Sequence, residues 1–220
     1  MKVAIAGAGA VGRSIARELL SNSHEVLLLE RRLDNIDEAS VPGARWINAD
    51  ACELDNLEQA HLHTCDVMIA ATGDDKANLV VSLLAKTEFA VARVVARVND
   101  PRNEWLFDEG WGVDVAVSTP RMLASLVEEA VSVGDLVRLM TFRQGQANLV
   151  EVTLPANTPF AGKAVRKLAL PRDAALVAVL RGGRVFVPQP DDPLEAGDEL
   201  VFIAPTEAED ALHEAVLSTT

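Results

Sequence analysis

The chain has 220 residues, of which 49% are hydrophobic and 24% charged, so its length suits two small domains and its composition excludes overall disorder. A formal net charge of −13 at pH 7 repels phosphate backbones, and we expect no nucleic-acid partner. The two cysteines lack metal-ligand spacing and no apolar run approaches the length of a membrane span, which excludes a disulfide scaffold and predicts no membrane-spanning segment.

The first half of the chain alternates apolar, β-branched runs with helical stretches. Runs that are apolar on both faces are typical of parallel strands covered by helices on both sides. We predict strands at 2–7, 24–30, 44–50, 66–73, 93–99 and 113–118. We predict helices at 12–21, 75–86 and 120–133. This alternation predicts an α/β fold, a Rossmann-like doubly wound parallel sheet that binds its ligand at the carboxyl ends of the strands.

The last of these helices has clear boundaries in the sequence. Thr119 is a candidate N-cap, Pro120 suits the first helical position and Gly134 suits the stop. Its apolar face comprises Met122, Leu123, Leu126, Val127, Ala130 and Val131. We expect this helix to close the first domain, residues 1–134.

The stretch VAIAGAGAVG, residues 3–12, carries the pattern G-x-G-x-x-G between a predicted strand and a predicted helix. Gly7 would permit the tight turn, Gly9 would let the backbone approach a phosphate, and Gly12 would let the helix pack close to the strand. The unpaired N–H groups at the helix start would face the anion. The pattern therefore predicts a phosphate-binding turn.

Glu30 closes the second predicted strand, where a carboxylate accepts hydrogen bonds from ribose hydroxyls. The same charge would repel a 2′-phosphate and so disfavours NADP. Arg31 and Arg32 temper that inference, because a guanidinium can hold a phosphate. The alternative is that Glu30 is a solvated charge at a strand end.

Three further strand ends supply candidate contacts. Asp50, Ala51 and Cys52 follow the third strand, where a base could rest. After the fourth strand come Thr72, Gly73 and Asp74, with Asp75 as a possible N-cap of the next helix. The fifth strand ends in Arg97 and Asn99, although an isolated arginine is often only a surface ion-pair partner.

After Gly134 the pattern changes to that of a smaller α+β domain, residues 135–220. Residues 135–155 predict two strands around a glycine-containing turn, and residues 173–190 a hairpin with Gly182 and Gly183 at its tip. A further strand is expected at 198–205 and a helix at 206–217. Thr206 and Glu209 have the spacing of a capping box for that helix.

The sequence offers little for redox catalysis. A nicotinamide-dependent dehydrogenase needs an acid or base beside the substrate carbonyl. The chain contains no tyrosine, which excludes a Tyr–Lys proton relay, and His24, His61, His63 and His213 show no metal-ligand spacing. These features favour a nucleotide sensor that is not an enzyme, with an NAD-dependent oxidoreductase as the alternative.

Five segments occur in an order that resembles a known family: GAGAVG, LLLE, NADAC, AATGDDKAN and ARVNDP. They resemble the RCK (regulator of K⁺ conductance) fold of TrkA- and KtrA-type potassium-uptake regulators. In the second half, FAGKAVRKL, AVLRGGRVFVP and LEAGDELVFIA resemble the C-terminal RCK domain of that family. The glycine motif is shared with many dehydrogenases, so the TGDD-x-x-N and ARV-N stretches are the more specific part of the resemblance.

The resemblance implies a cytoplasmic regulatory subunit that binds an adenine nucleotide, NAD(H) or ADP/ATP. It implies homo- or hetero-oligomers of RCK subunits that act on a membrane potassium channel or transporter, with the chain at the inner face of the membrane through that partner. Some ATP-responsive relatives carry arginine where this chain has Ala10, and Arg13 is the nearest substitute.

The candidate nucleotide-binding residues come from the glycine turn and the ends of strands two to five. They are Gly7, Ala8, Gly9, Ala10, Val11, Gly12, Glu30, Arg31, Asp50, Ala51, Cys52, Ala71, Thr72, Gly73, Asp74, Asn78 and Arg97. We expect no catalytic and no metal-ligating residue.

Overall fold

The structure is a computed structural model that describes residues 1–131, 133–142 and 147–217. Its contacts divide the chain into two compact units, Met1–Pro120 and Arg121–Thr220. This division groups most of the helix predicted at 120–133 with the second unit. The domain boundary after Gly134 stays a prediction. Within the described residues, no helix combines the length and apolar character needed to cross a membrane.

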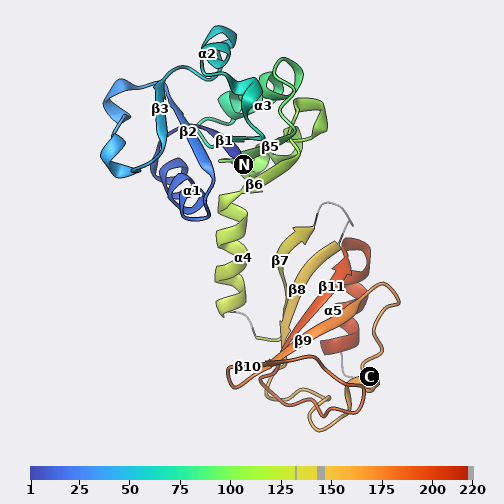
Figure 1. Ribbon diagram of the computed structural model, residues 1–220. Helices are drawn as coiled ribbons and strands as arrows, with labels where there is room; N and C mark the ends of the chain where they lie inside the picture. The colour runs from blue at the N-terminus through green and yellow to red at the C-terminus, as the bar shows by residue number, and fades with distance from the viewer. Residues whose placement is uncertain (132, 143–146, 218–220) are drawn as a thin grey trace. The chain divides into compact units, whose positions relative to one another are not determined.

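The first unit is built on a six-stranded parallel sheet (Figure 1). Its strands are β1 (Lys2–Ala6), β2 (Glu25–Glu30), β3 (Arg45–Asn48), β4 (Val67–Ala70), β5 (Arg93–Val98) and β6 (Val115–Ser118). Its helices are α1 (Ala10–Ser21), α2 (Leu54–Gln59) and α3 (Asp75–Thr87), and α4 (Thr119–Val131) follows β6 but lies mostly in the second unit. The spatial order β3-β2-β1-β4-β5-β6 is that of a doubly wound sheet, which confirms the predicted fold class.

Both faces of this sheet are buried, as the continuous apolar runs predict. Alternate residues of the strands point to opposite faces, so Val3 and Ile5 pack with Ala16 of α1. Ala4 and Ala6 face the other side, in a cluster that also contains residues of α2 and α3. The two layers of helices leave the carboxyl ends of the strands as the edge where a ligand can enter.

Helix α2 is the main element of the first unit that the sequence analysis missed. It has only six residues, and of these only Leu57 is buried. So short a helix carries too little apolar periodicity to stand out. The loop that connects β3 to α2 contains Asp50, two residues after the end of β3, so α2 matters for how that strand end is shaped.

The second unit contains an antiparallel five-stranded sheet in the order β10-β9-β11-β8-β7. The strands are β7 (Leu136–Phe142), β8 (Ala147–Thr153), β9 (Ala175–Arg181), β10 (Arg184–Phe186) and β11 (Glu199–Pro205), and the helix is α5 (Glu209–Leu217). Val150, Val152 and Phe202 form a core with Leu212 and Val216 of α5. The predicted α+β character of the second domain is confirmed.

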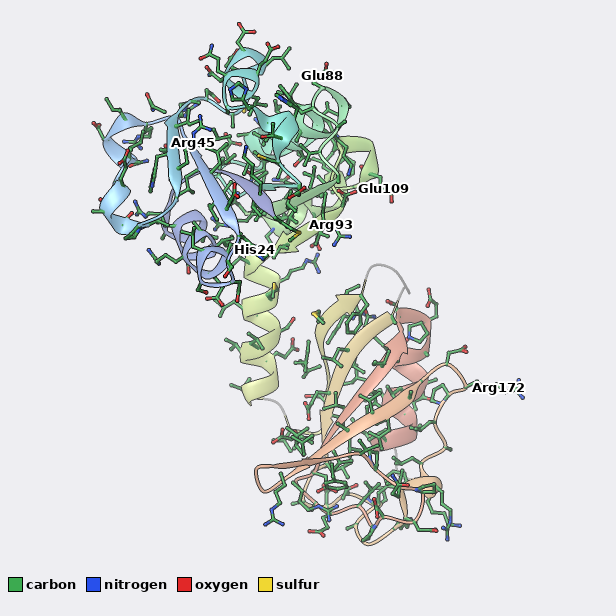
Figure 2. All side chains as sticks on the ribbon, in the orientation of Figure 1. His24, Arg45, Glu88, Arg93, Glu109 and Arg172 are labelled. Atoms are coloured by element: carbon green, nitrogen blue, oxygen red, sulfur yellow. The ribbon has the colours of Figure 1, made fainter. Side chains whose placement is uncertain are left out.

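Two turns were predicted in this unit. The turn between β9 and β10 has positive φ at both Gly182 and Gly183, as a two-residue hairpin requires. The predicted turn between β7 and β8 lies outside the described residues. Figure 2 shows the side chains of both units, with Arg45, Arg93 and Arg172 among the labelled surface residues.

The predicted capping box at the start of α5 is replaced by a different network. Residues 206–208 form a 3-10 turn before α5 begins at Glu209. The side-chain amide of Asn148 donates to the Thr206 hydroxyl at 3.0 Å and to the Glu209 carboxylate at 2.5 Å. Arg138 donates to the same carboxylate through two nitrogens, at 3.0 and 2.6 Å. Glu209 thus ties α5 to β7 and β8.

Candidate nucleotide-binding site

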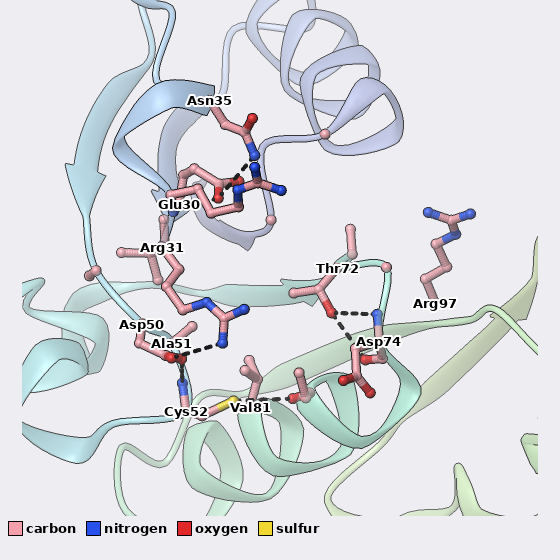
Figure 3. A pocket seen from close by; sticks show the side chains of 18 of the residues that line it. Glu30, Arg31, Asn35, Asp50, Ala51, Cys52, Thr72, Asp74, Val81 and Arg97 are labelled. Atoms are coloured by element: carbon pink, nitrogen blue, oxygen red, sulfur yellow. Dashed lines mark hydrogen bonds and ion pairs between the residues drawn. The ribbon is translucent and has the colours of Figure 1, made fainter.

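A cavity of about 570 Å³ opens at the carboxyl ends of the parallel strands, in the size range of ligand pockets (Figure 3). The predicted residues that line it are Gly7, Gly9, Ala10, Val11, Glu30, Arg31, Asp50, Ala51, Cys52, Ala71, Thr72, Gly73, Asp74 and Arg97. Segments that are distant in sequence therefore meet at one pocket. Ala8, Gly12 and Asn78 are also candidates but lie behind this lining.

Six lining residues were missed by sequence reasoning: Leu29, Arg32, Asn35, Ala49, Ala77 and Val81. Four of these are apolar and have no chemistry that a motif could reveal. Arg32 was weighed only as a charge beside Glu30. Asn35 lies beyond the strand end, in a short 3-10 turn that no periodicity announces.

The glycine turn after β1 has the geometry expected of it. Gly7 has φ of +95°, and a Cβ there would lie 2.9 Å from Cα of Thr72. A Cβ on Gly12 would lie 1.9 Å from the carbonyl oxygen of Gly7, so only glycine lets α1 pack this closely on the turn. A Cβ on Gly9, by contrast, has no neighbour within 4 Å. The turn thus presents bare backbone to the pocket, beside the unpaired N–H groups at the start of α1.

Glu30 is buried, with 7% of its surface exposed, and its carboxylate is held by backbone groups. One oxygen accepts from the N–H of Ala8 at 2.9 Å. The other accepts from the N–H of Arg32 at 2.8 Å and from the side chain of Asn35 at 3.5 Å. Each carboxylate oxygen has two acceptor sites, so Glu30 clamps the glycine turn to β2 and keeps capacity for a sugar hydroxyl.

A second set of polar contacts lies at the end of β3, around the side chain of Asp50. One oxygen of Asp50 accepts from the N–H of Cys52 at 3.0 Å, and the other lies 3.5 Å from the guanidinium of Arg31. Burial, followed by the negative charge of Asp50, raises the pKa of the Cys52 thiol from 9.0 to about 11. Cys52 is therefore a neutral thiol at physiological pH and a poor nucleophile.

The Asn78 side chain connects the ends of β4 and β5. It is completely buried, and its oxygen accepts from the N–H and the hydroxyl of Thr72 at 2.9 and 2.6 Å. Its nitrogen donates to the carbonyls of Thr72 and Arg97 at 3.3 and 2.8 Å. All of its hydrogen-bonding groups thus serve the protein, so Asn78 shapes the pocket wall from behind.

Asp75 was predicted as the N-cap of α3, but its neighbour Asp74 has that role. The N-cap of α3 is Asp74, whose side chain accepts from the N–H of Lys76 at 2.8 Å. Asp75 instead points inward and accepts from the backbone of Asn99 and Asp100 and from the side chain of Asn103, at 2.7–3.0 Å. Burial acts to raise the pKa of Asp75, but these hydrogen bonds outweigh it and lower the pKa below its usual value. The N-cap prediction for Asp75 was one residue late.

Arg97 is the cation beside the glycine-turn end of the pocket. Its Nε is buried and has no hydrogen-bond partner among the described residues, which is costly for a charged group. Figure 3 shows its side chain beyond Thr72, separate from the Arg31–Asp50 pair. Arg13, considered as a substitute at the glycine turn, is not among the lining residues. Arg97 therefore offers a guanidinium with an unsatisfied Nε–H to an anion in this part of the pocket.

A 3-2-1-4-5-6 parallel sheet, a glycine turn after β1 and an acid ending β2 define a protein of the Rossmann class with a nucleotide-type pocket. Family models match most of the chain: residues 3–119 match the TrkA-N domain and residues 149–217 match the TrkA-C domain. The chain belongs to the TrkA family.

Two relatives illustrate the range of that family. The chain is 70% identical to the Trk system potassium uptake protein TrkA of Mycobacterium tuberculosis (strain ATCC 25618 / H37Rv) over 217 residues, which cover 99% of both chains. It is 30% identical to a TrkA homolog of Methanothermobacter thermautotrophicus, over 94% of this chain and 95% of the relative.

Solved structures share the fold at lower identity. The GsuK channel bound to NAD superposes with a TM-score of 0.71 and 20% identity, over the whole of this chain and 40% of the channel chain. The Shewanella denitrificans Kef C-terminal domain in its AMP-bound form has a TM-score of 0.52 and 23% identity, over 60% of this chain and 80% of the other. At these identities the likeness concerns the fold alone.

Proposed function

We propose that this chain is the nucleotide-binding regulatory subunit of a membrane potassium-uptake system. The observation that carries the proposal is the convergence, in one pocket, of a bare glycine turn, the buried carboxylate of Glu30 and the guanidinium of Arg97, whose Nε has no partner among the described residues. The relatives are named for potassium uptake, which supplies the system on which the subunit acts. The proposal includes a cytoplasmic location, at the inner face of the membrane through that partner.

The order of the strands orients the ligand. Glu30 ends β2, which lies between β3 on one side and β1, β4 and β5 on the other. Phosphates would lie at the glycine turn, Thr72 and Arg97, the ribose at Glu30, and the base at the end of β3. Adenine nucleotides, NAD(H) or ADP/ATP, fit this sequence of groups, and the GsuK and Kef neighbours are bound to NAD and AMP.

The site is suited to sensing rather than catalysis. No histidine lines the pocket in the described part of the chain, and its one thiol has a pKa of about 11. Glu30 is engaged by three donors and held in place, whereas a general base must meet the proton that it removes. Substrate-dependent turnover of NADH by the pure chain would replace this proposal by the oxidoreductase alternative.

Regulation of a gate requires several coupled copies. Shifting a two-state equilibrium from mostly closed to mostly open takes about 5.5 kcal/mol of differential binding, whereas one coupled site supplies about 1–3 kcal/mol. Helix α4 offers a surface for self-association, because its predicted apolar face is exposed. Half or more of the surface is accessible for Met122, Leu123, Leu126, Val127 and Val131.

We therefore expect a second copy of this chain to cover α4. Sedimentation should show a dimer or larger species that Leu126→Glu converts to monomer. Glu128→Gln, on the same helix, should leave assembly unchanged. A wild-type chain that stays monomeric at all concentrations, with and without nucleotide, would contradict this part of the proposal.

The binding test is calorimetric titration of the ligand-free chain with NAD⁺, NADH, ADP, ATP and AMP. Glu30→Gln keeps the size of the side chain but removes its charge, and it should weaken the best ligand at least about 10-fold. Glu25→Gln makes the same change at the opposite, exposed end of β2 and should leave affinity unaltered. A wild-type chain that binds none of the five nucleotides, with no shift in melting temperature, would refute the proposal.

A further inference from the structure

The base end of the pocket differs in character from the rest of its lining. Its walls are small and apolar: Ala49, Ala51, Ala77 and Val81 line it beside Cys52. The Cys52 thiol is neutral, and its sulfur faces the carbonyl of Ala77 at 3.9 Å. Such a surface suits the flat, apolar face of a heterocyclic ring.

One side of this slot is formed by a long charged side chain. Arg31 extends from the end of β2 toward Asp50 at the end of β3, where the two lie 3.5 Å apart (Figure 3). Arg31 is 73% exposed, so this ion pair is screened by water and holds the side chain only weakly. The guanidinium therefore lies over the slot and is free to adjust.

We infer that Arg31 covers the base of the bound nucleotide, stacking its guanidinium on one face of the ring while the alanine-rich wall contacts the other. The inference rests on the proposed function, since it concerns the same site. It follows from the order of the strands: with the ribose at Glu30 and the phosphates toward β1, β4 and β5, the base has only the β3 end to occupy.

The planar guanidinium explains why arginine suits this position. It can stack on an aromatic ring and keep an edge directed to the carboxylate of Asp50, whereas a lysine ammonium offers charge without a plane. Arg31 is thus a specificity-determining residue that favours ligands with a large aromatic base. Its charge is already partnered by Asp50, so its contribution comes mainly from the stacked plane.

The test separates two contributions of the Arg31 guanidinium to nucleotide affinity: its planar shape and its charge. Wild type, Arg31→Lys and Arg31→Tyr are titrated with ADP and with NAD⁺, which share the adenosine group. Arg31→Lys keeps the charge but removes the stacked plane, and it should weaken binding about 3- to 30-fold, the range expected for loss of such a stacking contact. Arg31→Tyr supplies a plane without charge and should stay within about 3-fold of wild type.

Matched controls come from Arg45, an exposed residue of β3 outside the pocket lining (Figure 2). Arg45→Lys and Arg45→Tyr should leave both affinities unchanged. Full affinity in Arg31→Lys with loss in Arg31→Tyr would show that charge alone acts and overturn the inference. Equal losses in both variants, or none in either, would overturn it too. Failure of the wild-type chain to bind either ligand would instead refute the proposed function.

Discussion

The two ends of the proposed nucleotide pocket are held by different means. At the phosphate end, the buried side chain of Asn78 makes four hydrogen bonds that join Thr72 to the backbone of Arg97. At the base end, an exposed ion pair at 3.5 Å joins Arg31 to Asp50, and the exposed side chain of Asn48 donates to the carbonyls of Glu30 and Arg31. Buried, satisfied hydrogen bonds specify a geometry more strictly than a screened surface pair does.

This contrast suggests a division of labour. A phosphate end that is in place before binding loses little freedom when the ligand arrives, so it supplies affinity. A base end with an adjustable arginine would accept the adenine of several nucleotides, in keeping with NAD(H) and ADP/ATP as candidates. Three predictions test the contrast.

The largest effect is expected at the glycine turn. Gly12→Ala should destabilise the chain by more than about 3 kcal/mol, because the new Cβ would lie 1.9 Å from the Gly7 carbonyl oxygen and must push α1 away. Denaturant unfolding measures the loss. Gly9→Ala is the control: its Cβ meets nothing within 4 Å, so stability should change by less than about 1 kcal/mol while nucleotide affinity falls. Equal stability losses in the two variants would contradict the geometry described.

An intermediate effect is expected from the pair Asn78→Asp and Asn48→Asp. Each change removes two hydrogen bonds that the side-chain amide donates to backbone carbonyls at the pocket. Asn78 is buried and lies at the phosphate end, whereas Asn48 is exposed and lies at the base end. Asn78→Asp should cost about 2–4 kcal/mol of unfolding free energy, because a carboxylate oxygen replaces the donating NH2 group and faces the buried carbonyl oxygens of Thr72 and Arg97.

Asn48→Asp should cost less than about 1 kcal/mol, because water replaces the lost donor. Urea unfolding of both variants, with ADP titration of each folded protein, makes the comparison. Similar costs at the two sites would show that the two ends are equally rigid.

The smallest effect concerns the Cys52 thiol. Its pKa of about 11 means that the folded state keeps the proton more tightly than an ordinary thiol of pKa 9.0 does, so alkylation at pH 8 should be roughly 100-fold slower than for an ordinary thiol. The rate should rise with pH up to about 11. As pH rises from 9 to 11, the unfolded chain loses this proton first, so the contribution of Cys52 to stability declines in that window.

Iodoacetamide kinetics in a Cys65→Ala background isolate this thiol, and saturating ADP should slow its reaction further. A Cys52 rate that levels off near pH 9 would show that burial and Asp50 do not shift its pKa as described.

Much of the site follows from local patterns. The glycine spacing between a strand and a helix predicts the turn, and Glu30, Asp50 and Thr72 are recognisable because each follows an apolar run. The directions in which individual side chains point could not be predicted in the same way. Asp74 and Asp75 are adjacent and chemically identical, yet one caps α3 and the other is buried against Asn99 and Asn103. Sequence alone does not distinguish them, because the distinction depends on where β5 lies.

The order of elements, the parallel sheet and the location of a ligand edge are properties of local periodicity and turn chemistry, and the amino-acid sequence is sufficient for them. The inward turn of Asn78, the apolar slot of Ala49, Ala77 and Val81, and the reach of Arg31 toward Asp50 depend on contacts between segments far apart in the chain. Those contacts exist only once the strands are laid side by side, and so they were decided by the tertiary structure.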